Sequence, residues 1–228
     1  MSSFILKIIA CITMLLCHIP FVFPDLSIPL LYIGKLSFPI YAFLISEGYI
    51  HTKNFSKYLT RLMVFAVISQ IPAYILFQPG KMYFNIFFTL AFGLLGIKAI
   101  DKISEKYISI PIVILLAFLA EVFGFDYGCI GVLMIVCFYY FKSNKLSMVL
   151  AEMFLMFILY IKNFSYYAQT VENLKFILLQ LLFSVASLLF ILFYNGKKGK
   201  SNKAIQLLFY CFYPVHLIIL NLLKLYIS

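Results

Sequence analysis

Apolar residues run along this chain in blocks of about twenty, separated by short polar joints. About twenty residues at 1.5 Å each form a helix about 30 Å long, which crosses the hydrocarbon core of a bilayer. The pattern predicts nine such helices, at residues 4–23, 27–50, 57–77, 83–100, 108–124, 126–141, 146–162, 174–194 and 204–226. A membrane barrel would show alternating segments of about ten residues, so we expect an all-α polytopic transmembrane helical bundle.

Proline and glycine interrupt the chain at the joints. Pro20 and Pro24 follow the first block, and Asn195–Gly196 follows the eighth. The fifth and sixth blocks are short and share the hinge at Gly124–Gly128, so eight to ten spans are compatible with the pattern. Because the joints leave no room for a soluble domain, we expect residues 1–228 to form a single integral-membrane domain.

Composition narrows the class of protein and its partners. Hydrophobic residues make up 64% of the chain and the mean hydropathy is +1.05, which excludes an ordinary soluble protein and makes the lipid bilayer a partner. The net charge of +10 comes from lysines gathered in particular joints, which is typical of an orientation signal and not of a nucleic-acid surface. Five cysteines lie in or beside apolar blocks without CxxC spacing, so we expect free thiols and no metal site.

Basic residues are unevenly divided among the joints. The joints after even-numbered blocks hold Lys53, Lys57, Arg61, Lys98, Lys102, Lys106, Lys142, Lys145, Lys197, Lys198, Lys200 and Lys203, whereas the others hold Lys81, Lys162 and Lys175. Because basic loops stay in the cytoplasm, we expect a multi-pass protein of the cytoplasmic (inner) membrane with a cytoplasmic N-terminus. An odd number of spans would then place the C-terminus outside.

Two ionisable residues share one face of the first predicted helix. Lys7 and His18 are eleven residues apart, which is about three helical turns and a rise of roughly 16 Å. An ionisable group at membrane depth is costly and usually faces a protein interior with a functional reason. His18 could act as a general base, because imidazole titrates nearest to neutral pH. The alternatives are a structural histidine and, for Lys7, an interfacial anchor.

Other ionisable groups lie within or beside later blocks. In the second block Lys35 and Glu47 are about 18 Å apart along the helix axis and cannot pair, whereas Glu47 and His51 can meet at the cytoplasmic boundary. In the last block His216 follows Pro214, which breaks the helix ladder, and this combination often marks a cavity. Lys35 and Glu47 are either functional groups or polar residues at an interface.

A basic stripe begins the third block. Lys53, Lys57 and Arg61 have the spacing i, i+4 and i+8, and like charges at this spacing repel unless an anion lies against them. That anion is a lipid head group or a phosphorylated cosubstrate, and Arg61 suits bidentate phosphate binding best. A plain topological anchor is the alternative, mainly for the two lysines.

Polar residues also begin two blocks on the outward side. Asn85 begins the fourth, and Asp126 and Tyr127 begin the sixth. They could line an acceptor site, and helix capping by Asn85 and Asp126 is the alternative.

The order of these elements resembles the TraX family, membrane proteins associated with N-terminal acetylation of pilin, which is similar in turn to the acyltransferase-3 superfamily of integral-membrane acyltransferases. The basic-x10-His element at Lys7 and His18 is the superfamily's most specific motif, and His216 lies at a family-typical position. Cys17 stands where the family usually has an acid, and Lys35 where it often has arginine. The matching stretches are LKIIACITMLLCH (6–18), IGKLSFPIYAFLISEGYIHT (33–52), YLTRLMVFAVISQIP (58–72), FNIFFTLAFGLLGI (84–97), DYGCIGVLMI (126–135) and FYPVHLIIL (212–220).

The resemblance implies an acyltransferase-3-like fold and transfer of an acetyl group from acetyl-CoA, or of another acyl group from its CoA ester, with no metal. The acceptor would be an amine or hydroxyl of a membrane-associated or extracytoplasmic molecule, such as a pilin-like surface protein or an envelope glycan. His18 would be the general base or would carry the acyl group, and another group must orient its ring if Cys17 replaces an orienting acid. The implied sites are catalytic (His18, Lys7, Glu47, His216), CoA-binding (Arg61, Lys57, Lys53, Lys35) and acceptor-binding (Asn85, Asp126, Tyr127).

Two other functions fit the same residues. A proton-coupled small-molecule transporter would use His18, Glu47 and His216 as proton-relay groups. A non-catalytic assembly factor for a surface structure would keep the fold without the chemistry, which the departure at Cys17 allows.

Overall fold

Three polar side chains begin helices where the sequence pattern changes. The side chain of Ser2 accepts from the amide of Ile5 at 3.4 Å and begins α1 (Ser3–His18). Asn54 accepts from the amide of Lys57 at 2.9 Å and begins α4 (Phe55–Phe77), and Asn85 accepts from the amide of Phe87 at 3.1 Å and begins α5 (Ile86–Lys102). Each cap satisfies an amide that the first helical turn leaves unpaired, so local sequence determines these starts.

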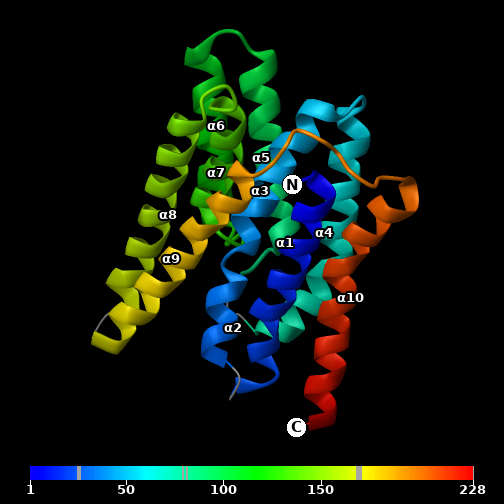
Figure 1. Ribbon diagram of the computed structural model, residues 1–228, viewed down its shortest axis with the longest axis vertical. Helices are drawn as coiled ribbons and strands as arrows, with labels where there is room; N and C mark the ends of the chain where they lie inside the picture. Colours follow the sequence, from blue (N-terminus) through cyan, green and yellow to red (C-terminus); the bar gives the residue numbers. More distant parts are fainter. Residues whose placement is uncertain (25–26, 79, 81, 168–170, 228) are drawn as a thin grey trace. The chain divides into compact units, whose positions relative to one another are not determined.

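The computed structural model describes residues 1–24, 27–78, 80, 82–167 and 171–227, which leaves Lys81 outside the described residues. Within these ranges the chain is helical apart from turns and one isolated bridge between Phe84 and Phe125, and the predicted all-α bundle is confirmed. The remaining helices are η1 (Ile19–Phe21), α2 (Ser27–Gly34), α3 (Ser37–His51), α6 (Lys106–Val122), α7 (Gly128–Tyr140), α8 (Lys145–Tyr167), α9 (Val171–Leu192) and α10 (Lys203–Ile227) (Figure 1).

The helices have the lengths of a multi-pass membrane protein. Among the described residues, five stretches are long and apolar enough to cross a bilayer: Ser3–Phe21, Pro29–His51, Phe55–Phe77, Asn173–Leu192 and Lys203–Ile227. The other predicted blocks also form helices, α5 to α8, with ends within a few residues of the predicted ones.

The second predicted block, 27–50, differs from the expectation because two helices replace one. Its chain turns at Lys35 and Leu36, between α2 and α3, and the hydroxyl of Ser37 donates to the carbonyl of Gly34 at 2.8 Å. Pro39 gives the physical reason, because its ring would clash with the carbonyl of Lys35 four residues earlier in a continuous helix. The break places Lys35 at a turn inside an apolar segment.

Contacts divide the described chain into two compact units. Unit 1 comprises residues 1–41, 75–77 and 156–228, and unit 2 comprises residues 42–74 and 78–155. The predicted single domain stays a prediction, because helices α3, α4 and α8 each contribute residues to both units.

In unit 1, α1 packs against α2, η1 and α10, and α2 packs against α9. Helices α1 and α10 run side by side in the same direction (Figure 1). Gly34 allows the close approach of α2 to α1, because a Cβ atom there would lie 2.4 Å from the Cβ of Cys17. This contact lies one residue before His18.

In unit 2, α5, α6 and α7 pack against one another. The turn between α6 and α7 has positive φ at Gly124 (65°), Tyr127 (63°) and Gly128 (51°), which agrees with the predicted glycine hinge. The Glu121 carboxylate accepts from the amide of Cys129 at 3.1 Å and lies where a Cβ atom on Gly128 would be. The hinge therefore requires glycine at its end and is held by an acidic cap.

Candidate functional site

His18 and His216 meet in unit 1. His18 is the last residue of α1, and His216 lies in α10 two residues after Pro214. Nδ1 of His18 lies 2.8 Å from Nε2 of His216, and the two rings are nearly parallel, with 5° between their planes and 5.1 Å between their centroids. That separation is too long for face-to-face contact, so the rings meet edge to edge through the hydrogen bond.

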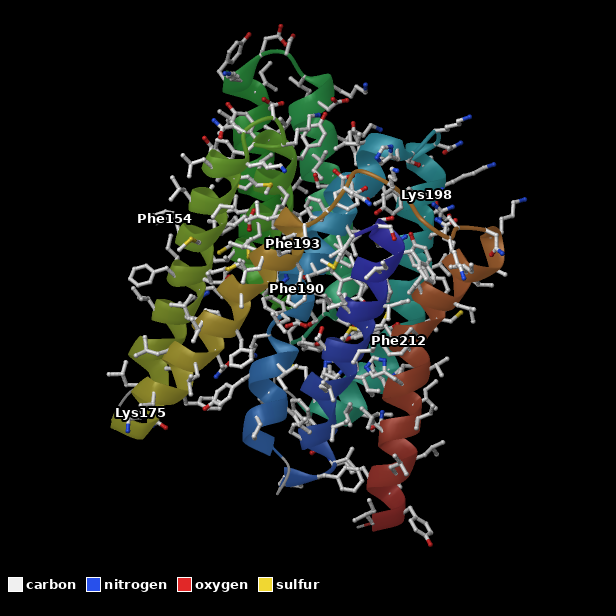
Figure 2. All side chains as sticks on the ribbon, viewed as in Figure 1. Phe154, Lys175, Phe190, Phe193, Lys198 and Phe212 are labelled. Atoms are coloured by element: carbon white, nitrogen blue, oxygen red, sulfur yellow. The ribbon has the colours of Figure 1, made fainter. Side chains whose placement is uncertain are left out.

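The hydrogen bonds determine which nitrogen carries each proton in the neutral pair. Nδ1 of His216 lies 2.7 Å from the carbonyl oxygen of Phe212, which only accepts, so Nδ1 carries the hydrogen. Nε2 of His216 is then an acceptor, and Nδ1 of His18 must donate to it. The lone pair of His18 is therefore on Nε2. The carbonyl of Phe212, a residue labelled on α10 in Figure 2, thus sets the tautomer of a ring on α1.

Aromatic rings surround the histidine pair. Phe77, the last residue of α4, lies 5.0 Å from the His18 ring between centroids, and Tyr213 lies 6.2 Å away at a steep angle. Phe212 lies 5.0 Å from His216. His216 is only 5% exposed, whereas His18 is half-buried. The surroundings hold both rings in place and limit the access of water.

Lys35 lies within electrostatic reach of His18. Its ammonium acts on His18 and on Tyr160 of α8, and Tyr160 is hydrogen-bonded to Ser184 of α9. The turn between α2 and α3 therefore brings a cation into the neighbourhood of His18. The sequence pattern did not single out Tyr160, because one tyrosine among seventeen gives no signal by itself.

Cys17 lies against α2 at Gly34. Its Cβ, Cα and Sγ atoms all lie within 2.9 Å of the position that a Cβ on Gly34 would take. The side chain that lies within hydrogen-bond distance of Nδ1 of His18 is that of His216.

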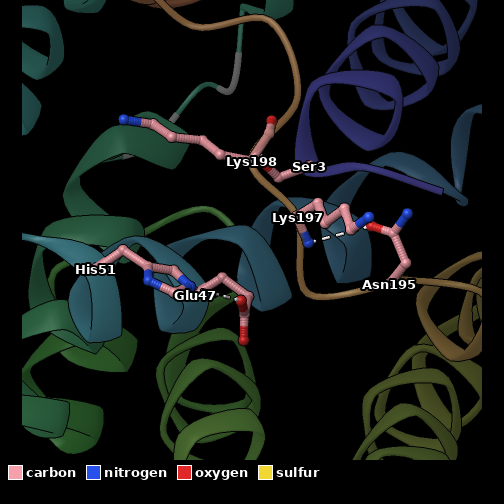
Figure 3. Close-up of polar contacts among 6 residues, drawn as sticks. All are labelled: Ser3, Glu47, His51, Asn195, Lys197 and Lys198. Carbon is pink, nitrogen blue, oxygen red and sulfur yellow. Dashed lines mark hydrogen bonds and ion pairs between the residues drawn. The ribbon is translucent and has the colours of Figure 1, made fainter.

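Lys7 lies on the same helix as His18, at its other end. Its ammonium is 5.6 Å from the centroid of the Phe209 ring on α10, and it lies near the charge of Lys198. The amide of Ser3 donates to the carbonyl of Lys197 at 2.9 Å and its hydroxyl donates to the carbonyl of Lys198 at 2.9 Å, which joins the start of α1 to the segment before α10 (Figure 3). Lys7 and the lysine run therefore share one end of unit 1.

The predicted basic stripe is shorter in the structure. Because Asn54 caps α4, Lys53 lies in the loop before the helix and only Lys57 and Arg61 keep helical spacing. The guanidinium of Arg61 lies 5.8 Å from the ring centroid of Tyr58. Lys57 and Lys53 are exposed, and Arg61 is half-buried.

Glu47 pairs with His51, as the spacing predicted. Their side chains are 3.5 Å apart at the end of α3 (Figure 3). Other charged groups of unit 2 also have partners, which the sequence pattern did not reveal. The carboxylate of Asp101 accepts from the hydroxyls of Tyr49 and Tyr139 and pairs with Lys102 at 2.9 Å.

Among the residues predicted to bind the acceptor substrate, Asn85 makes hydrogen bonds that stabilise the fold. It is fully buried, and its amide nitrogen donates to the carbonyl of Ala66 at 2.7 Å and to Oε1 of Gln70 at 2.8 Å, in addition to its capping bond. The carbonyl of Asp126 accepts from the hydroxyl of Thr89, and Tyr127 precedes α7 with positive φ. These residues organise the turn between α6 and α7.

A buried carboxyl in unit 2 was missed by the sequence analysis. Glu152 of α8 is 0% exposed, and neither of its oxygens has a hydrogen-bond partner among the described residues. The available signal was an acid inside the apolar block 146–162, where an ionisable group is costly.

Comparison with known proteins identifies relatives of this chain. A family model described as TraX protein matches residues 2–224. The chain is 32% identical over 175 residues to the probable fimbrial assembly protein FimC, serogroup H1, of Dichelobacter nodosus, and the match covers 68% of this chain and 70% of that protein. No solved structure matches the chain.

Proposed function

The chain belongs to the TraX family, and from this premise we propose that it is an integral-membrane acyltransferase that transfers an acetyl group, or another acyl group, from acyl-CoA. The observation that carries the proposal is the hydrogen-bonded pair of His18 and His216, whose bond to the Phe212 carbonyl leaves a lone pair on Nε2 of His18. A half-buried imidazole with a determined tautomer is suited to general-base catalysis.

In the proposed reaction His18 takes a proton at Nε2 from the amine or hydroxyl of the acceptor as that group attacks the thioester carbonyl. The imidazolium then donates this proton to the departing CoA sulfur, so the histidine is regenerated. His216 holds the ring in position through its hydrogen bond and accepts at Nε2 throughout. The step needs no metal and no other reactant than the acyl donor and the acceptor.

Lys35 supports the proposal as a cation near the reacting base. Charge that develops on the thioester oxygen is stabilised by a cation or a hydrogen-bond donor inside a site of low dielectric constant. Lys35 fits this function, because it acts electrostatically on His18. The predicted departure from arginine to Lys35 keeps this charge.

The phosphates of CoA require a basic surface at the end of the helices. Lys57 and Arg61 lie one turn apart on α4, and Lys53 lies directly before its cap, so these residues fit a polyanion. We assign this end to the cytoplasm, with the protein in the inner membrane, because basic joints stay on the cytoplasmic side. The likeness to the acyltransferase-3 superfamily remains part of this proposal.

The acceptor that we propose is an amine or hydroxyl of a surface protein of the pilin type or of an envelope glycan. The curated relative is named as a fimbrial assembly protein, and acylation of a fimbrial subunit or of a surface glycan is a chemistry that such a function can use. The proposed function is therefore a step of pilus assembly or conjugation, in which the chain acylates such an acceptor.

The experiment compares cells that carry the chain with cells that carry His18→Ala, by mass spectrometry of surface proteins and glycans. We expect the acetyl group on the acceptor to disappear while the amount of membrane-inserted protein is unchanged. His51→Ala is the matched control, because it removes the remaining histidine of the chain from an exposed position, and it should leave the modification intact.

Acetylation that persists in His18→Ala would contradict the proposal. If the surface structure is lost in a deletion strain while no acyl group changes, the chain is an assembly factor without this chemistry. If purified protein binds no acyl-CoA but carries protons across a vesicle membrane in a His18-dependent way, it is a transporter.

A further inference from the structure

Glu152 lies on the inward face of α8. Met148, Glu152 and Leu155 are buried, whereas Leu150, Met153 and Phe154 are exposed, as expected for a helix with one face toward lipid. Phe154, two residues after Glu152, is exposed and projects outward from α8 (Figure 2). The carboxyl therefore faces protein, and no charged or polar side chain among the described residues bonds to it.

A buried carboxyl without a partner is costly and needs an explanation. Its two oxygens are completely buried, and Glu152 acts electrostatically on a neighbouring polar group, the thiol of Cys137 on α7. An ionised carboxylate without a counter-charge is strongly disfavoured in apolar surroundings, whereas the neutral acid carries one donor and one acceptor. Intramembrane acids that face the protein interior usually mark a substrate or proton pathway.

The chemistry of the neutral acid selects the kind of ligand. An amide group offers one N–H donor and one carbonyl acceptor, so it matches both hydrogen-bonding functions of the acid without bringing a charge into the site. An ammonium ligand would have to leave water and would leave the acid's donor unused. A neutral chain with amide groups is therefore the best complement.

The depth of Glu152 in the membrane fits a neutral ligand with amide groups. Seven residues separate it from Lys145 at the start of α8, which is a rise of about 10 Å from the polar end of the helix. This end belongs to the basic joints that we assign to the cytoplasm. A ligand whose phosphates stay at that end would have a neutral arm at this depth.

We infer that Glu152 is a binding site for an amide of the pantetheine arm of acyl-CoA. The inference rests on the proposed function and names a contact in unit 2 for the same cosubstrate. Met148, one turn before Glu152 on the buried face, is a flexible side chain that can move aside for the arm.

The test measures binding of acetyl-CoA and of adenosine 3′,5′-bisphosphate, which lacks the arm, to purified protein in lipid nanodiscs. Glu152→Leu should weaken acetyl-CoA binding about tenfold and leave binding of the bisphosphate unchanged, since only the contact to the arm is lost. Glu152→Gln, which keeps a donor and an acceptor, should bind acetyl-CoA within about threefold of the wild type. Met153→Leu, on the exposed face of the same helix, is the control and should bind both probes normally.

A second readout serves if Glu152→Leu does not fold. Dicyclohexylcarbodiimide reacts with neutral carboxyl groups in apolar surroundings: the acid O–H adds across one C=N bond, and the acyl group then moves to nitrogen without a leaving group. Peptide mass spectrometry should find this adduct on Glu152 in the wild type, and acetyl-CoA, but not the bisphosphate, should prevent it.

Normal binding of acetyl-CoA by Glu152→Leu, or labelling that acetyl-CoA does not affect, overturns the inference and leaves the proposed function standing. Equal loss of binding of both probes in Glu152→Leu also overturns the inference, because the substitution has then disturbed the whole site. Wild-type protein that binds neither probe overturns the proposed function, and the inference falls with it.

Discussion

The two units bury ionisable groups in opposite ways. In unit 1, His18 bonds to His216, and His216 bonds to the carbonyl of Phe212, so the chain itself satisfies the donors and the shared acceptor of the pair. In unit 2, Glu152 has no partner for either oxygen among the described residues. The internal bonds of the pair determine its chemistry directly, since they place a lone pair on Nε2 of His18. The function of Glu152 can be inferred only from the missing hydrogen-bond partners of its carboxyl among the described residues.

The largest expected effect removes the partner that sets the tautomer of His18. In His216→Ala, Nδ1 of His18 loses its acceptor and the ring can take the other tautomer, so kcat should fall about 100-fold, within the range of general-base catalysis. KM for acyl-CoA should change little, because His216 is a positioning residue. Steady-state kinetics of purified protein measure both constants.

His216→Gln is the conservative variant for this comparison. The side-chain oxygen of glutamine can accept from Nδ1 of His18, so most of the lost kcat should return. An equal loss of kcat in the alanine and glutamine variants would mean that His216 acts through packing. The contact between His18 and His216 would then be structural and would not set the tautomer of His18.

The next effect tests whether the contact between α1 and α2 holds the pair in place. Gly34→Val puts side-chain atoms where Cys17 lies, 2.4 Å from a new Cβ, so the free energy of unfolding should fall by about 1–3 kcal/mol. Denaturant unfolding measures the change. Ile12→Val is the control, because it changes a side chain at an exposed position of α1 and should have no measurable effect. Equal stability losses at the two positions would contradict the packing explanation.

The comparison of His216 with Glu152 predicts changes of opposite sign in the free energy of unfolding. Replacing the partnered His216 with leucine leaves the Nδ1 donor of His18 unsatisfied and should destabilise the ligand-free protein by about 1–3 kcal/mol. Replacing the unpartnered Glu152 with leucine removes an unsatisfied group and should raise the stability by about 1 kcal/mol. Thermal unfolding in nanodiscs without acyl-CoA compares the two. A destabilised Glu152→Leu protein would show that the carboxyl serves the fold.

The smallest expected effect on stability comes from a comparison of two carboxyl groups within unit 2. Asp101 differs from Glu152 because it accepts from two tyrosines and pairs with Lys102. Its side chain is 27% exposed, and Asp101→Asn should therefore destabilise the protein by only about 1 kcal/mol. Glu105→Gln, at an exposed loop position bonded to Ser104, is the control and should have no measurable effect. No difference between the two variants would show that the tyrosine contacts contribute little.

Much of this arrangement could be predicted from the sequence because it depends on local periodicity. The apolar blocks correspond to helices, and the caps at Ser2, Asn54 and Asn85 use local side chains. The break at Lys35 was missed, although Pro39 was visible, because the apolar pattern on both sides is continuous. Periodicity measures burial and length, and it does not measure whether a helix is interrupted.

The candidate site was predicted only in part. His18, His216 and Lys35 were each selected as ionisable groups within apolar blocks. Their arrangement could not be predicted, because 198 positions separate the two histidines and no local rule sets the contact between α1 and α10. Glu152 was visible in the sequence, but its lack of a partner depends on every neighbouring helix.

The sequence by itself determined that this chain is a helical membrane protein of the TraX family, with charged groups at membrane depth, because hydropathy and motif spacing are properties of the chain. Only the tertiary structure decided that His216 orients His18 and that Glu152 has no partner. The physical reason is that a hydrogen bond needs two groups within about 3 Å, and the packing of helices far apart in sequence sets that distance.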